Sequence, residues 1–311
     1  MKKFLGVIFV LFAIVVVLQI SMQETQNKDE DRLSKPIVAL STFSLYDIAK
    51  HIAGDTLDVF MIMPPGVDAH SFEPTPKLMV KIQKSALVVY SGAGLEPWIK
   101  KFQFKSDVID MSKYVKLREL EEDEHHHHEH DEHCSHDSSL DPHYWLDIDN
   151  MIKATQVITE AFVKILPEYK HLYYKNESAY IKMLKELDAE YKASLKECKK
   201  DTIIVNHDAF SYLAQRYGFH VEALSGLSPD AQPSAKNMAK LIEHVKEYGI
   251  KTVFFESFAS DKAIKSIANE AKVKVDLLYP LGNITKEQTN ATYQELMKIN
   301  LQKISHAMEC R

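Results

Sequence analysis

The sequence predicts a two-lobed α/β protein, in which each lobe holds a mostly parallel sheet flanked by helices and one long rigid helix joins the lobes. Short apolar runs of strand length alternate with helical segments, a pattern that favours parallel sheets buried on both faces. The alternation occurs in two separate blocks. Between the blocks lies a long helical segment without internal glycine or proline.

In the first block, turn and capping residues mark where the elements end. Gly54 stops a helix, and the run Pro64–Gly66 breaks a strand. Thr75 before Pro76 is typical of a helix N-cap followed by proline at the first helical position. The expected elements are strands at 36–43, 57–63, 86–90 and 107–111, a helix at 44–54 and a helix that begins near residue 76.

The second block begins at Thr202 and repeats the alternation, with Gly218 ending its first helix. The expected strands cover residues 202–206, 252–255 and 273–278, and the expected helices cover 209–217, 234–248, 260–271 and, last and longest, about 287–308.

The segment between the blocks runs from Pro167 to Cys198, and its apolar residues recur at spacings of three and four. As one helix these 32 residues would span about 48 Å. A rigid strut is the favoured interpretation, and two shorter helices with a kink are the alternative. The expected divisions are 1–35 (signal or anchor, and tether), 36–165 (N-terminal lobe), 166–198 (linking helix) and 199–311 (C-terminal lobe).

The N-terminus is typical of an export signal. Lys2 and Lys3 precede an apolar run from Phe4 to Leu18, and a polar stretch follows. No clean cleavage site is present. A spanning helix needs roughly 20 apolar residues, and the run is close to that length, so an uncleaved anchor is the second interpretation. A buried core helix is the third. With a signal or an anchor, the domain is expected to be periplasmic or otherwise extracytoplasmic.

The net charge of −6 is concentrated in one run, residues 121–137, which holds eight acidic residues, seven histidines and no Lys or Arg. The rest of the chain is nearly neutral, which argues against nucleic acid as a partner. The run lacks apolar residues for a core, and its carboxylates and imidazoles indicate a loop that binds divalent cations. A purely solvating acidic linker is the alternative.

The three cysteines do not make a disulfide framework. Cys134 lies among the histidines of the acidic run. Cys198 and Cys310 each end a predicted helix, so an oxidising compartment would allow a bridge between them. Two independent thiols are the other possibility.

Three histidines lie where loop residues can converge on a ligand. His70 follows the strand that ends at Met63, His143 lies in DPHYWLD, and His207 directly follows a strand. In open α/β sheets, ligands bind beyond the carboxyl ends of the strands, so we expect a site between the lobes. Imidazole nitrogen suits zinc. Taken singly, each histidine is more often a turn residue, the class to which we assign His51, His171, His220, His244 and His306.

The motifs PPGVDAHSFEPTP, DPHYWLD, NHDAF, FFES and LLYPLG occur in an order and spacing that resemble the metal-binding receptors of bacterial ABC importers (cluster A-I, or cluster 9), in particular the zinc-specific ZnuA-type solute-binding proteins. The resemblance covers the chain from about residue 36 to the end. It implies two lobes joined by a long helix, a zinc ion held by His70, His143 and His207, and an ABC permease with its ATPase as partners of a monomeric receptor.

Two positions depart from the pattern of these receptors. Tyr279 stands where manganese-binding and some zinc-binding relatives carry an aspartate, and Ala69 stands where proline is usual. The expected fourth ligand is water, with a carboxylate of the acidic run or Glu256 as second choice. Glu256 is expected more to orient an imidazole than to bind the metal.

Two other functions remain open from the sequence. An exported zinc-binding adhesin or zinc store would need no permease. A zinc hydrolase or hydratase would use three histidines and a water, but Glu256 is its only obvious general base, and we therefore expect no enzymatic activity.

Overall fold

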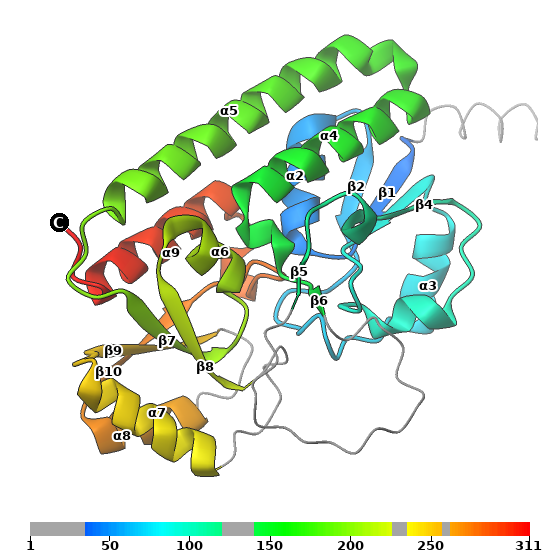
Figure 1. Ribbon diagram of the computed structural model, residues 1–311. Coiled ribbons are helices and arrows are strands. Elements are labelled where there is room, and N and C mark those ends of the chain that lie inside the picture. The colour runs from blue at the N-terminus through cyan, green and yellow to red at the C-terminus, as the bar shows by residue number, and fades with distance from the viewer. Residues whose placement is uncertain (1–34, 120–139, 226–234, 257–261) are drawn as a thin grey trace, which may run out of the picture.

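The computed structural model describes residues 35–119, 140–225, 235–256 and 262–311, which form two lobes around two four-stranded parallel sheets (Figure 1). Helices flank both sheets, so the predicted fold class is confirmed. The expected signal or anchor and the acidic run lie outside the described residues. Among the helices that are described, none combines the length and apolarity needed to span a membrane.

The first lobe is built on a parallel sheet in the order β2-β1-β3-β4. The central strand β1 is buried at Val38, Ala39 and Leu40. It is shorter than expected, because a helix already begins at Phe43, with Thr42 in extended conformation at its N-cap position. The elements are β1 (Ile37–Leu40), α2 (Phe43–Ala53), β2 (Asp58–Met61), α3 (Pro76–Gln83), β3 (Leu87–Tyr90), β4 (Asp107–Asp110), and the hairpin strands β5 (Arg118–Glu119) and β6 (Leu140–Asp141).

The second lobe repeats the plan with the strand order β10-β9-β7-β8. Strand β8, which was not predicted from the sequence, begins two residues after Gly218, the glycine that ends the preceding helix. The elements are β7 (Thr202–His207), α6 (Ser211–Tyr217), β8 (His220–Ser225), α7 (Ala235–Glu247), β9 (Thr252–Glu256), α8 (Lys262–Ala271) and β10 (Lys274–Leu278).

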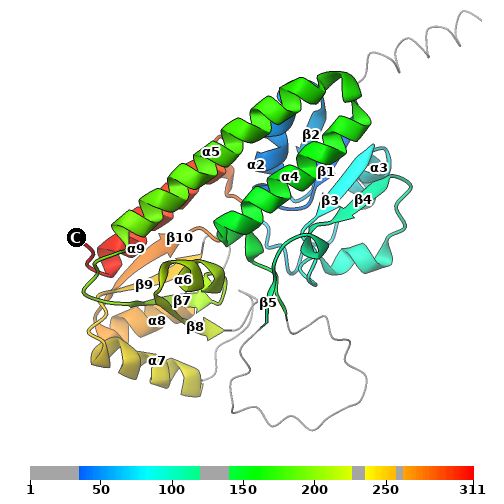
Figure 2. The same ribbon diagram turned by 45° about the horizontal axis from the view of Figure 1, so that its top comes forward.

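The linking segment is one uninterrupted helix, α5 (Lys170–Ser194), so the kinked alternative is wrong. It starts three residues later than expected, after a 3₁₀ turn at Pro167–Tyr169. Its buried side chains, which include Leu184, Leu187 and Tyr191, follow the predicted stripe. Helix α4 (Ile148–Ile165), to which the sequence analysis assigned no element, packs along α5 (Figure 2).

The chain crosses back to the first lobe after β10. The backbone N–H of Phe43 donates to the Gly282 carbonyl (2.9 Å), and the Asn283 amide donates to the carbonyls of Pro64 (2.8 Å) and Val67 (2.7 Å). The last helix, α9 (Tyr293–Ala307), then runs beside α5 (Figure 2). The lobes are therefore joined by α5, by the crossing segment 279–292 and by α9.

Helix α9 begins at Tyr293 and not near residue 287 as expected. Thr292 and Glu295 form a capping box at its start, whereas Lys286–Gln288 make a separate 3₁₀ turn. At the other end, Cys198 and Cys310 form a disulfide that ties the chain after α5 to the chain after α9. Of the two states considered for these cysteines, the bridge is the one observed.

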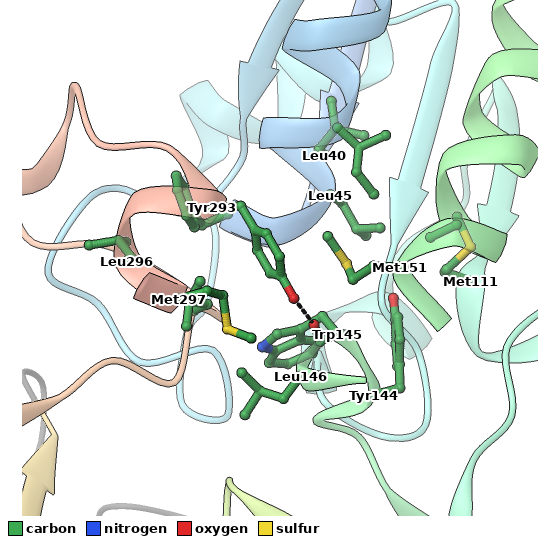
Figure 3. Packing of buried hydrophobic residues seen from close by; sticks show 14 of the residues in the cluster. Leu40, Leu45, Met111, Tyr144, Trp145, Leu146, Met151, Tyr293, Leu296 and Met297 are labelled. Carbon is green, nitrogen blue, oxygen red and sulfur yellow. Dashed lines mark hydrogen bonds between the residues drawn. The ribbon is translucent and has the colours of Figure 1, made fainter. Parts of the chain in front are cut away.

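Trp145 lies where the first lobe meets α9 and the crossing segment. Figure 3 shows the Tyr293 hydroxyl donating to the Trp145 carbonyl, over 2.6 Å. The indole N–H of Trp145 donates to the Pro280 carbonyl, also over 2.6 Å. A Cβ atom at Gly282 would lie 3.1 Å from the indole ring, so a glycine there allows the crossing segment to approach. This packing fixes the chain two residues after His143.

Candidate metal centre

The structure brings His70, His143 and His207 together between the lobes. His70 lies in the loop between β2 and α3, His143 directly precedes the 3₁₀ turn Tyr144–Leu146, and His207 is the last residue of β7. One ring nitrogen from each histidine lies within 4.8 Å of the other two. In tetrahedral zinc sites such nitrogens are about 3.3 Å apart, so small ring rotations would allow all three to share one ion.

The cavity between these imidazoles is small and partly open. Its volume is about 20 Å³, and its wall includes Trp145, Glu256 and Pro280 beside the three histidines. A volume of this size holds about one water molecule. The space between the three imidazoles therefore has the size of an ion.

Asp141, which the sequence analysis missed, positions His143. Its carboxylate accepts from the backbone N–H of His143 at 3.0 Å and lies 2.9 Å from Nδ1 of the same residue. Because Nδ1 is engaged, Nε2 is left for a metal, the arrangement that carboxylates commonly impose on zinc-binding histidines. Asp141 stands two residues before His143 in DPHYWLD. This spacing is the only feature of the sequence that could have indicated its orienting role.

Asp141 is itself held from both lobes. The Arg118 guanidinium lies 3.7 Å from its second carboxylate oxygen. From α6 of the second lobe, the Tyr212 hydroxyl donates to the Asp141 carbonyl and accepts from the Arg118 N–H, each over 2.8 Å. The β5–β6 hairpin thus fixes Asp141 and, through it, the ring of His143.

Glu256 lies against the corresponding ring nitrogen of His207. It ends β9, its side chain is 2 % exposed, and its Oε1 contacts Nδ1 of His207. Neither of these two atoms makes a well-directed hydrogen bond within the described residues. Glu256 does not join the three histidines in the group of mutually close ligand atoms. The contact therefore favours the expected orienting role over direct ligation.

The environment keeps two of the three imidazoles neutral. Burial, together with the charge of His143, lowers the pKa of His70 and of His207 to about 3. Burial also acts to lower the pKa of His143, but the hydrogen bond and charge of Asp141 outweigh it, so that pKa is raised. Burial raises the pKa of Glu256 well above its ordinary value. His70 and His207 thus offer free lone pairs at neutral pH.

Tyr279 directly follows β10 and contacts residues of α9, outside the cavity wall. Asn300 holds its backbone from both sides, accepting from the Tyr279 N–H (3.0 Å) and donating to its carbonyl (2.7 Å). The Lys303 ammonium lies 5.5 Å from the centre of the Tyr279 ring. Tyr279 is not part of the cavity wall, so the three imidazoles converge without a carboxylate from this strand.

The remaining histidines of the described chain lie apart from this centre. His51, His171 and His244 are on α2, α5 and α7, and His244 contacts Glu222. His220 and His306 also lie outside the group of close ligand atoms.

Known proteins resemble this chain over nearly its whole length. The family model described as "Zinc-uptake complex component A periplasmic" matches residues 38–307. The high-affinity zinc uptake system protein ZnuA of Bacillus subtilis is 34% identical over 99% of this chain and 98% of its own length. The zinc-binding lipoprotein AdcA of Streptococcus pneumoniae is 32% identical over 88% of this chain, which spans only 56% of that longer relative.

Solved structures agree with these sequence matches. The Zn(II)-bound ZnuA-like domain of Streptococcus pneumoniae AdcA superposes with a TM-score of 0.73 at 32% identity, over 89% of this chain and all of that one. The laminin-binding protein Lmb of Streptococcus agalactiae, described as a bifunctional adhesin with metal-transporting activity, gives a TM-score of 0.78 at 30% identity, over 88% of this chain and all of Lmb. The chain belongs to the ZnuA family of zinc-uptake components.

Proposed function

We propose that this protein is a high-affinity receptor that captures zinc outside the cytoplasm, holds it with His70, His143 and His207, and delivers it to an ABC importer. The observation that carries the proposal is the convergence of three ring nitrogens, from both lobes, on a cavity of about 20 Å³. Membership of a zinc-uptake family and a Zn(II)-bound structural neighbour support it.

The donor set favours zinc over manganese. Three imidazole nitrogens form a borderline-soft site, whereas manganese prefers carboxylate and carbonyl oxygens. The side chain of Tyr279 contributes no carboxylate, and Glu256 lies against His207. The fourth position therefore suits a water molecule, which a partner could displace when the ion is released.

A competition titration of zinc against a chromophoric chelator tests the proposed ligands. The wild-type protein should bind one zinc ion tightly, and the triple variant H70A/H143A/H207A should lose this site. The matched control H51A/H171A/H244A removes three histidines from helices and should titrate like wild type. Tight zinc binding in the first triple variant would contradict the proposal.

Deleting residues 121–137 separates the acidic run from the tight site. We propose that the run collects zinc at low affinity near the cavity, so the deletion should remove weak sites and leave the tight one. If the tight site disappeared as well, the run would have to supply a ligand.

The partners follow from the family. We propose that a permease and its ATPase receive the zinc, and that the N-terminal run exports or anchors a monomeric receptor. We propose no catalytic role, because the matching family model describes a zinc-uptake component and not an enzyme. The test is zinc uptake in cells that lack this chain, complemented with wild type or with H70A/H143A/H207A. Equal uptake from both would argue against delivery.

The likeness to Lmb favours a second candidate function, that of an exported adhesin. Purified protein should then adhere to immobilised laminin. The variant H70A/H143A/H207A would separate the two activities if it folds and still adheres to laminin but fails to restore zinc uptake.

A further inference from the structure

A cluster of charged side chains joins the lobes and is built on Arg216 of α6. The Arg216 guanidinium donates from Nε to Asp188 of α5 over 2.7 Å, and from Nη1 to Asp147 of the first lobe over 3.1 Å. Its Nη1 and Nη2 also donate to Asp149 of α4, over 2.8 Å and 3.2 Å. We use the name Arg216 contact for these bonds. One side chain of the second lobe thus binds the first lobe and the linking helix together.

Two of the three carboxylates in the Arg216 contact are shielded from water. The side chain of Arg216 is only 13 % exposed, and those of Asp147 and Asp188 are covered to a similar degree, whereas that of Asp149 is 76 % exposed. Hydrogen bonds between charged groups are strong where water is excluded, and an exposed ion pair contributes little. The bonds to Asp147 and Asp188 are therefore the ones that hold Arg216 in place.

Asp147 connects the Arg216 contact to His143. It lies four residues after His143 in the chain, and its backbone N–H closes the 3₁₀ turn Tyr144–Leu146. One carboxylate oxygen of Asp147 caps α4 by accepting from the Asn150 N–H over 2.9 Å, and the other accepts from Arg216. Asp147 therefore fixes the turn that follows His143 to α4 on one side and to the second lobe on the other.

Helix α6 binds the chain on both sides of His143. Tyr212 lies four residues before Arg216 and hence on the same face of α6. Its hydroxyl donates to the carbonyl of Asp141, two residues before His143, whereas Arg216 binds the chain after His143. The same helix begins four residues after His207, the last residue of β7. Helix α6 therefore sets the separation between the segments that carry His143 and His207.

We propose that Arg216 is a positioning residue of the zinc site, which acts through Asp147 to hold His143 at the distance from His207 that a shared ion needs. This inference rests on the proposed receptor function and adds to it a contact that slows zinc release. Without the Arg216 contact, the lobes can move apart slightly beside the centre, while α5, α9 and the crossing segment still join them. The arrangement that binds zinc is then a smaller fraction of the population, and the apparent affinity falls by that fraction.

The rate of zinc release, followed by stopped flow with excess chromophoric chelator, tests the proposal in the full-length protein. Arg216→Met keeps most of the side-chain length and removes the charge. It should release zinc about 10-fold faster than wild type, as expected when the binding arrangement becomes tenfold rarer, with a smaller change in the association rate. Arg216→Lys keeps the charge without the planar fork and should restore part of the slow release.

Lys192→Ala is the matched control. It removes another cation that binds Asp188, but one that lies on α5 itself and joins no lobes, so zinc release should stay at the wild-type rate. Circular dichroism shows whether each variant folds. Release from a folded Arg216→Met variant at the wild-type rate would overturn the proposal, and so would equal acceleration by Lys192→Ala.

Asp147→Asn tests the route from Arg216 to His143 and serves if Arg216→Met does not fold. It keeps an oxygen that can cap α4 and loses the charge that pairs with Arg216, so it should accelerate zinc release as much as Arg216→Met. The double variant R216M/D147N should release zinc no faster than either single variant, because two residues that act through one contact are not additive. A general loss of stability would leave release from the folded protein unchanged, and additive acceleration would overturn the route through Asp147.

Hydrogen exchange in the zinc-free protein separates this inference from the receptor function on which it rests. In the presence of chelator, the backbone amides of residues 141–147 should exchange several-fold faster in Arg216→Met than in wild type or Lys192→Ala. This readout needs no zinc, so it reports the Arg216 contact even if wild type bound no zinc tightly, a result that would contradict the receptor function. Exchange in Arg216→Met at the wild-type rate would show that Arg216 does not hold this segment, and would overturn the positioning role.

Discussion

Two buried carboxylates stand behind the imidazoles of the candidate metal centre. Asp141 engages Nδ1 of His143, and Glu256 contacts Nδ1 of His207. His70, the remaining histidine of the centre, is only half-buried. A carboxylate behind a histidine fixes the ring and raises the basicity of the nitrogen that faces the metal, and losing one typically lowers metal affinity 10–100-fold.

Asp141→Ala should therefore weaken zinc binding about 10–100-fold, because His143 loses the group that orients its ring. Asp107→Ala, which removes an exposed carboxylate of β4 in the same lobe, is the control and should leave zinc affinity unchanged. A competition titration measures both, with circular dichroism to confirm that the variants fold. Unchanged affinity in Asp141→Ala would remove Asp141 from the metal centre.

Glu96 is a buried carboxyl that supports the wall of the cavity without facing it. It accepts from the Ser41 hydroxyl and from the backbone N–H groups of Ser91 and Gly92, next to Leu95 of the cavity wall. Burial raises its pKa from the ordinary 4.5 to about 7 despite these bonds. Between these two values the folded state holds more protons than the unfolded state, so the contribution of Glu96 to stability falls as pH rises.

Glu96→Gln should remove this contribution. When the pH rises from 5 to 8, the free energy of unfolding of wild type should fall relative to that of the variant. The change should be on the order of 3 kcal/mol or less. Urea unfolding at both pH values measures it, and other titrating groups cancel in the comparison. Parallel pH profiles for the two proteins would show that Glu96 ionises normally in the folded state.

At the scale of elements, Asp47 of α2 binds both helices that connect the lobes. Its carboxylate accepts from the Tyr180 hydroxyl of α5 (2.7 Å) and from the backbone N–H of Tyr293 (3.2 Å), at the start of α9. Both helices begin beside the first lobe and end beside the second. Asp47 therefore ties the middle of α5 and the start of α9 to α2.

Asp47→Ala should lower the free energy of unfolding by about 1–3 kcal/mol, because two buried donors lose their acceptor. Tyr180→Phe removes only one of these bonds and should have a smaller effect. Asp55→Ala, at an exposed carboxylate just after α2, should change little. Chemical denaturation measures all three, and equal effects of Asp47→Ala and Asp55→Ala would refute this role.

The disulfide joins the far ends of the same connection. Cys198 and Cys310 are 112 residues apart in sequence, so the bridge closes a long loop in the unfolded chain. The double variant C198S/C310S should therefore unfold at lower temperature, with a loss of about 2–4 kcal/mol. Cys134→Ser, which removes only the remaining thiol, should leave the melting temperature unchanged. A double variant as stable as wild type would mean that the bridge adds nothing.

At the scale of the whole molecule, the proposed zinc ligands come from both lobes. His70 and His143 belong to the first lobe, and His207 ends a central strand of the second. A shared ion would tie the lobes together. The disulfide, α5, α9 and the crossing segment already restrict their relative motion, so we expect zinc to add stability with little change in shape.

Zinc should raise the melting temperature of wild type, by an increment corresponding to about 2.7 kcal/mol at a free zinc concentration 100 times the dissociation constant. His207→Ala should lose most of this increment, because it removes the proposed ligand of the second lobe. His220→Ala, at the start of the edge strand β8, should retain it. Differential scanning calorimetry with and without chelator gives the comparison.

Local sequence patterns were enough to predict most elements and the candidate ligands. Glycine at 54 and 218 and proline at 76 stop or start helices by their own backbone chemistry, and these boundaries are confirmed. The apolar stripe of α5 predicted its buried face. The three histidines were found because each follows a strand or lies in a loop, where a polar side chain can reach a ligand.

Tertiary structure decided what depends on residues far apart in the chain. The role of Asp141, and the choice of His207 as the imidazole that Glu256 contacts, depend on contacts with particular ring nitrogens. A spacing along the chain does not specify these contacts. The backbone of Tyr279 is held by two hydrogen bonds to the Asn300 side chain, and the bridge from Cys198 to Cys310 follows from α5 and α9 ending side by side. Periodicity records only which face of an element is buried, whereas partners across the fold are chosen by packing of the whole chain.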